Sequence, residues 1–136
     1  MKINKKNTRD WLFYWIIVGG GIFVLLFLVT STWIGFGVQE KCMLAQGRYG
    51  GDCVDALISH LEDENNPIGE RNHAIWALGQ LGNAKALPVL EKYYTANIPE
   101  REPWNETISQ YELQKAISLT SGGFNITAFV WRNKYF

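Results

Sequence analysis

Residues 11–38 read WLFYWIIVGGGIFVLLFLVTSTWIGFGV, and no charged side chain interrupts this run. A helix rises about 1.5 Å per residue, so about 20 apolar residues are enough to cross the hydrocarbon core of a bilayer. Aromatic rings favour the headgroup level, and Trp11, Trp15 and Trp33 stand near the two ends of the run. The sequence therefore predicts a transmembrane helix over about residues 11–33.

The far end of this helix carries no recognisable cleavage signal. A cleaved signal peptide has an apolar region of about 7–15 residues, followed by a site with small residues, and the present run is roughly twice as long. We expect a signal anchor that is not cleaved. The span and its exit then cover residues 11–38, with Gly35 and Gly37 ending the helix.

Charge is distributed unevenly on the two sides of the predicted span. Residues 1–10 have a net charge of +3, and residues 39–136 have a net charge of −3. Basic flanks stay cytoplasmic, so we expect a cytoplasmic basic tail over residues 1–10 and a periplasmic domain, in the inner (cytoplasmic) membrane of a bacterium. The basic tail suits the anionic surface of the lipid bilayer, whereas the acidic domain argues against nucleic acid as a partner.

Three consecutive glycines, Gly19, Gly20 and Gly21, lie in the first half of the predicted span. Glycine weakens a helix, but it lets a second helix approach closely. We expect this face to pack against a transmembrane helix of another membrane protein subunit. Glycines that simply face lipid are the alternative.

Both cysteines of the chain follow the span within a few residues of each other. In the oxidising periplasm, Cys42 and Cys53 are expected to form a disulfide, which would close a loop over the linker at residues 39–52. Zinc binding by these cysteines is the alternative, but neither a Cys-x-x-Cys motif nor a pair of closely spaced histidines supports it. The sequence predicts no metal site.

Beyond residue 53 the apolar residues recur with the period of an α-helix. Four helices are predicted, with these apolar positions: Val54, Leu57, Ile58 and Leu61 in the first; Ala74, Ala77, Leu78 and Leu81 in the second, between Pro67 and Gly82; Leu87, Leu90 and Tyr94 in the third, capped by Asn83; and Ile108, Tyr111, Ala116, Ile117 and Leu119 in the fourth, over residues 106–120. Residues 95–104 hold two prolines and are predicted to form a loop. The chain is thus expected to be all-α, with a helical domain over residues 53–123.

Residues 71–90 read RNHAIWALGQLGNAKALPVL. This stretch resembles the HEAT-like repeat of the phycobilisome-lyase type, in which small residues let paired helices pack closely and a glycine forms the turn between them. The resemblance implies about two helical hairpins in this domain. HEAT-like repeats mostly form protein-binding surfaces, although the enzymes that share this repeat attach bilins to proteins.

The domain offers no set of residues that would carry out catalysis. Asp52 and Asp55 lie at a helix start, where acidic residues usually act as caps, and His60 is interpreted as a solvated side chain. We therefore expect no enzyme activity and no cofactor.

An aromatic tail follows the domain and reads FNITAFVWRNKYF over residues 124–136. A stack of only two repeats needs a cover at its ends, so the tail is expected to fold back on its own domain. Contact with the membrane surface or with a partner protein are the alternatives.

One row of the second helix departs from the repeat pattern. Asn72, Trp76 and Gln80 are spaced four residues apart and form a line beside the apolar face. Tryptophan is enriched among residues that dominate binding energy, so we predict that this row binds a partner protein. A tryptophan buried under the loop at residues 95–104 is the alternative.

Together these features predict a non-catalytic single-pass membrane protein. Its expected role is that of an accessory or scaffolding subunit of a larger membrane protein complex. The alternatives are an anchored attachment factor or enzyme related to the HEAT-type lyases, and a free anchored adaptor that recruits a soluble periplasmic protein.

Overall fold

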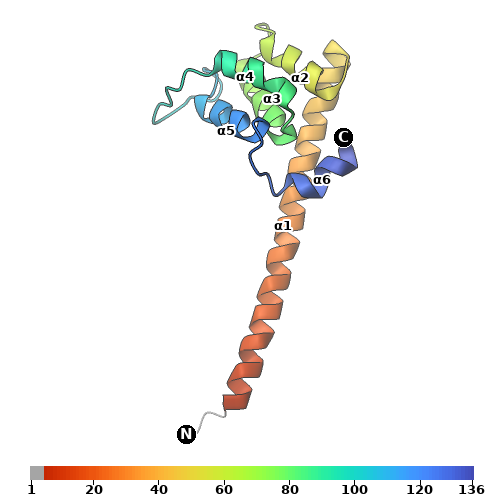
Figure 1. The fold of residues 1–136 in the computed structure, drawn as a ribbon, viewed down its shortest axis with the longest axis vertical. Coiled ribbons are helices and arrows are strands. Elements are labelled where there is room, and N and C mark those ends of the chain that lie inside the picture. The colour runs from red at the N-terminus through yellow and green to blue at the C-terminus, as the bar shows by residue number, and fades with distance from the viewer. Residues whose placement is uncertain (1–4) are drawn as a thin grey trace.

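The computed structural model describes residues 5–136, with side chains from residue 8 onward, so the basic side chains of Lys2, Lys5 and Lys6 in the predicted tail lie outside the described residues. Over this range the chain is all-α, as the sequence predicts, and it has no strand. The elements are α1 (Lys5–Tyr49), α2 (Cys53–Glu62), α3 (Ile68–Leu81), the short 3-10 helix η1 (Ala84–Ala86), α4 (Leu87–Tyr93), α5 (Gln110–Thr120) and α6 (Ala128–Tyr135). Figure 1 shows α1 as a long stalk that enters a head formed by the other helices.

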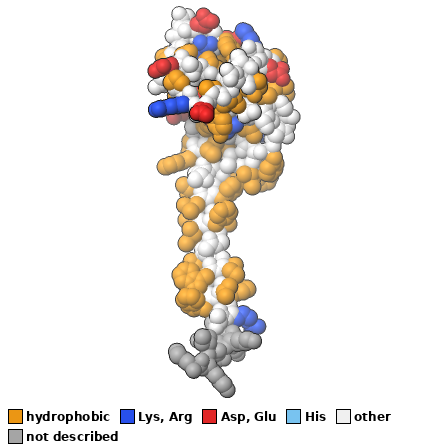
Figure 2. All heavy atoms as spheres, turned by 90° about the vertical axis from the view of Figure 1, so that its left-hand side faces the viewer, with side chains coloured by type: hydrophobic (Ala, Val, Ile, Leu, Met, Phe, Trp, Pro, Cys, Tyr) orange, Lys and Arg blue, Asp and Glu red, His pale blue; other side chains and the backbone are white. Residues whose placement is uncertain are grey.

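The apolar part of α1 stands clear of the rest of the described chain. Its large side chains between Trp11 and Val29 are exposed, except for the half-exposed Val18 and Phe27, and Figure 2 shows hydrophobic side chains in orange along the stalk. A buried core helix of a soluble domain would be covered, and soluble monomers rarely expose so large an apolar surface. This helix is long and apolar enough to cross a membrane and is compatible with a single-pass membrane anchor.

Helix α1 does not end near Gly35 and Gly37 but continues to Tyr49. The prediction that these glycines release the chain is wrong, because they are sites of close helix contact instead. A Cβ atom at Gly35 would lie 2.7 Å from the Cβ of Trp131 in α6, and one at Gly37 would lie 3.2 Å from the Trp76 ring in α3. The predicted linker over residues 39–52 is therefore mostly helix, and only residues 50–52 connect α1 to α2.

The turn after α1 has the same chemistry as the turn after α3. Gly50 and Gly51 have φ angles of 70° and 77°, and Gly82 has a φ angle of 61°, values that favour glycine. An Asx cap follows each turn: Asp52 accepts from the Asp55 amide at 2.8 Å, and Asn83 accepts from the Lys85 amide at 3.0 Å. The last turns of α1 and helix α2 are thus connected in the same way as α3 and the helices that follow it, η1 and α4.

The core of the domain begins in α1 and runs through the stacked helices. Fully buried side chains come from α1, α2, α3, α4 and α5: Val38, Leu57, Leu61, Ile75, Leu78, Leu90 and Leu113. Helices α3 and α5 pack closely at Gly79, where an added Cβ would lie 2.7 Å from the Ala116 Cα. We call residues 34–136 the helical domain, because the last turns of α1 are part of its core.

The predicted first and second helices are confirmed as α2 and α3. The fourth helix, α5, begins at Gln110, four residues later than the predicted start at residue 106. Ser109 is the N-cap of α5 and accepts from the Glu112 amide at 3.1 Å. The Glu102 carboxylate accepts from the Ser109 hydroxyl at 2.6 Å and from the Gln110 amide at 2.7 Å. These bonds fix the start of the helix, so the loop extends over residues 94–109.

The aromatic tail folds into α6 and packs across α1, where Figure 1 places it at the junction of stalk and head. The side chain of Trp131 is 1% exposed, and the Arg132 guanidinium donates to the Gln80 carbonyl at 2.6 Å. This bond satisfies a carbonyl at the end of α3. The tail therefore covers its own domain, as expected from the sequence.

A disulfide joins Cys42 in α1 to Cys53 at the start of α2, with the Cα atoms 5.1 Å apart. The predicted pairing is confirmed, and neither sulfur remains a thiolate for zinc. From the sequence, this bond was expected to close a loop over a linker. In the structure it joins two packed helices instead. It lies about two turns before the end of α1.

Reduction of this disulfide is expected to lower the free energy of unfolding of the helical domain by about 3 kcal/mol, since the closed loop is short. Chemical denaturation of the full chain in detergent, with and without reductant, measures the change. A Cys42→Ala/Cys53→Ala variant serves as control and should no longer respond to reductant. Equal stability of the wild-type chain in both conditions would contradict the prediction.

Candidate interaction surfaces

The predicted partner-binding row lies against other parts of the same chain. Asn72 is fully buried. Its amide donates to the Trp104 and Thr107 carbonyls at 2.7 and 2.9 Å, and its side-chain oxygen accepts from the Ser109 amide at 2.9 Å. Asn72 therefore holds the long loop over residues 94–109 onto α3, and the prediction that it faces a partner is wrong.

The other two residues of the row also face inward. The half-buried ring of Trp76 packs over Gly37 of α1. The Gln80 side chain accepts from the Asn125 amide at 2.9 Å, in the segment before α6. The row thus contacts three segments of its own chain, which accounts for its polar and aromatic character without a partner.

A different apolar surface remains open on α1. Trp33, Phe36, Met43 and Leu44, which we call the α1 stripe, lie on one face of the helix and are 75%, 53%, 63% and 58% exposed. The opposite face, with Val38, Cys42 and Ala45, is buried in the domain. Beside the stripe, Gln39 and Glu40 complete an open groove of about 520 Å³. This surface is not among the predicted sites, because residues 39–52 were predicted to be a linker; the helical spacing of these apolar residues was the available signal.

The glycine triplet is also open in the described chain. A Cβ atom added to Gly19, Gly20 or Gly21 would meet nothing within 4 Å. The chain itself therefore does not fill this notch. Packing of the triplet against another transmembrane helix stays a prediction.

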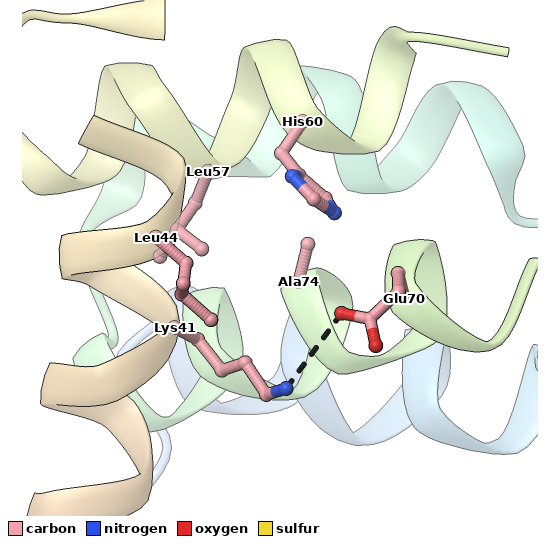
Figure 3. Close-up of a pocket in the computed structure, with 6 residues that line it drawn as sticks. All are labelled: Lys41, Leu44, Leu57, His60, Glu70 and Ala74. Atoms are coloured by element: carbon pink, nitrogen blue, oxygen red, sulfur yellow. Dashed lines mark ion pairs between the residues drawn. The ribbon is translucent and has the colours of Figure 1, made fainter. Parts of the chain in front are cut away.

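A small hollow lies where α1, α2 and α3 meet, as Figure 3 shows. Lys41 and Glu70 form an ion pair across it at 3.6 Å, beside His60, whose pKa is lowered chiefly by burial. Its volume of about 10 Å³ is near the minimum for one water molecule. The hollow is thus a small gap between three packed helices, and it is too small for a substrate.

The acidic residues at the start of α2 are held as structural groups. Lys85 lies 3.5 Å from the Asp52 carboxylate and 2.5 Å from that of Asp55. His60 lies near the other end of α2, with its ring centroid 5.9 Å from that of Tyr49. These three residues therefore do not form an acid–base group.

A second polar cluster fixes the end of α1 to the connection between α2 and α3. The Tyr49 hydroxyl donates to the Asp63 carboxylate at 2.6 Å, and Arg48 donates to the Asn66 side chain at 2.6 Å. The bonds from Tyr49 and from Asn65 hold the pKa of Asp63 at about 2. This carboxylate is thus charged at neutral pH and serves as a fixed acceptor.

Comparison with known proteins agrees with the repeat seen in the structure. Residues 70–95 match the family model of the PBS lyase HEAT-like repeat, and this range covers most of α3 and all of η1 and α4. No curated protein and no solved structure matches the chain. The chain thus carries a HEAT-like repeat, as its resemblance implies.

Proposed function

We propose that this chain is a non-catalytic, single-pass membrane protein that acts as an accessory or scaffolding subunit of a larger membrane protein complex. The α1 stripe is the observation that carries this proposal. It is an apolar face on a helix whose other side is locked into the domain, and it continues the apolar run of the span. Exposed apolar patches of this kind usually mark sites where another protein binds.

The continuity of α1 suits a scaffolding role. The glycine notch and the α1 stripe lie on one unbroken helix but on opposite sides of it, because Gly20 lies five full turns before Val38, on the face opposite to the stripe. Helix α1 could therefore contact one partner at the notch and another through an interface at the stripe. Apolar residues would fill the centre of such an interface, while Gln39 and Glu40 would supply a polar rim. The HEAT-like helices would hold this surface in place and offer further area for binding.

The proposed location is the inner membrane of a bacterium, with the domain in the periplasm. The net charge of the basic tail supports a cytoplasmic N-terminus. The disulfide between Cys42 and Cys53 supports an oxidising compartment for the domain. Both arguments give the same orientation.

Purification of the tagged full chain from membranes in mild detergent tests the proposal. We expect other membrane subunits to copurify in fixed stoichiometry with the wild-type chain. Met43→Glu places a charge in the α1 stripe and should lower their recovery at least about tenfold, since about 1.4 kcal/mol of lost affinity is enough for this change. Ser59→Glu, at an exposed position of α2, is the matched control and should have no effect.

Two outcomes of this purification would contradict the proposal. Unchanged recovery of the subunits with Met43→Glu would exclude the stripe as the binding surface. Recovery of a soluble periplasmic protein alone would instead support the anchored adaptor.

The glycine notch gives an independent prediction within the membrane. Gly20→Leu keeps the span apolar and should not prevent insertion, but its larger side chain should keep a partner helix away. We expect weaker copurification of the membrane subunits, with normal amounts of the chain in the membrane fraction. Val24→Leu is the control, and equal recovery in both variants would show that the glycines face lipid.

A further inference from the structure

The segment before α6 and the first turn of α6 together expose an apolar surface that no described residue covers. Phe124 and Phe129 are each 88% exposed, and Ile126 is 56% exposed; we call these three residues the tail patch. Surface phenylalanines are not unusual singly. Three large exposed apolar side chains within six residues instead indicate an interaction surface.

The packing of α6 fixes the height of this patch along α1. Trp131 rests on Gly35, and the rings of Phe36 and Tyr135 lie 5.6 Å apart between centroids. Gly35 follows Trp33, at the outer end of the apolar run, by about 3 Å of helix rise. Figure 1 shows the segment before α6 turning toward the bare part of the stalk, and Figure 2 shows hydrophobic side chains at the edge of the head that adjoins the stalk.

The charges around the patch differ from those of the rest of the domain. Residues 113–136 contain Lys115, Arg132 and Lys134 but no acidic residue, although residues 39–136 as a whole are acidic. Of these cations, Lys115 pairs with Glu112, and Arg132 donates to the Gln80 carbonyl. The exposed Lys134 lies on α6 itself. An apolar patch flanked by basic side chains is the pattern that binds the surface of an anionic bilayer.

We infer that the tail patch inserts into the headgroup region of the same bilayer that α1 spans. This inference rests on the proposed membrane span and adds a second point of contact. The headgroup region is roughly 5–8 Å thick on each side of the hydrocarbon core, which places α6 within it. A helix anchored at one point is free to tilt, whereas contact through the tail patch would set the angle between the domain and the membrane.

Depth measurements with nitroxide labels test the inference on the full chain in nanodiscs of phosphatidylcholine and phosphatidylglycerol. Phe129→Cys and Phe124→Cys are labelled without reductant, so that the native disulfide stays intact. Collisions with oxygen report the apolar phase, and collisions with a water-soluble nickel chelate report the aqueous phase. Leu25→Cys, in the middle of the predicted span, and Glu64→Cys, in the exposed connection after α2, are the two references.

Labels at residues 124 and 129 should collide more often with oxygen than with the nickel chelate, between the values of the two references. Preference for the chelate at both sites, with Leu25 reporting the apolar phase, would overturn the inference and leave the span intact. Low collision rates with both reagents would show that protein covers the patch and would also overturn it. If Leu25 reports the aqueous phase, the proposed span fails and the inference fails with it.

Discussion

Replacing Asn72 with alanine is expected to lower the free energy of unfolding of the helical domain by about 4 kcal/mol. The change removes three hydrogen bonds at once and leaves the Trp104 and Thr107 carbonyls and the Ser109 amide without their partner. Each net bond contributes about 1 kcal/mol, and groups left buried without a partner cost more. Chemical denaturation of the full chain in detergent measures the loss.

Hydrogen exchange gives a more local readout of the same variant. Amides of residues 94–109 should lose protection, because Asn72 makes the three side-chain hydrogen bonds that join this loop to α3. Asn97→Ala changes an exposed asparagine of the same loop and should alter stability by less than about 0.5 kcal/mol. Wild-type stability and loop protection in Asn72→Ala would contradict the structural role of Asn72.

A second large effect is expected from Trp131→Ala. Removing a fully buried tryptophan typically costs about 3–5 kcal/mol, because it loses apolar burial and leaves a cavity. Here the cavity would lie between α6 and α1, so α6 should separate from the stalk. Limited proteolysis and hydrogen exchange over residues 124–136 measure this release.

A second variant changes the residue of α1 that Trp131 contacts, Gly35. Gly35→Leu should also release α6, because even a Cβ atom at this position would lie 2.7 Å from the Trp131 Cβ. Phe129→Ala, which removes an exposed ring of the same helix, is the control and should leave α6 protected. A protected tail in both Trp131→Ala and Gly35→Leu would show that this contact does not hold α6 in place.

Local patterns in the sequence were sufficient for much of the fold. The 3.6-residue period predicts the buried faces of α2 and α3, and Gly82 ends α3 in the left-handed conformation as expected. The disulfide followed from two nearby cysteines and the inferred compartment. These features depend on neighbours in the chain, so sequence reasoning reaches them.

The remaining features depend on contacts between distant residues. Gly35 and Gly37 look like helix ends in the sequence, and only the positions of Trp131 and Trp76 reveal them as contact points. Asn72 looks like a surface residue because its three partners lie more than thirty residues further along the chain. The α1 stripe was not predicted because α1 was expected to end near Gly37. Residues 39–52 were then interpreted as a linker, in which apolar residues do not share one helix face.

The unbroken α1 also has a mechanical consequence. Its 45 residues extend over about 68 Å, and no turn separates the apolar segment from the part that is locked into the domain. Such a rod acts as a lever: a tilt of roughly 20°, which is common for membrane helices, displaces its far end sideways by roughly 20 Å. A neighbour that leans on α1 within the membrane would therefore swing the whole head, and twisting the helix about its axis would turn the head through the same angle.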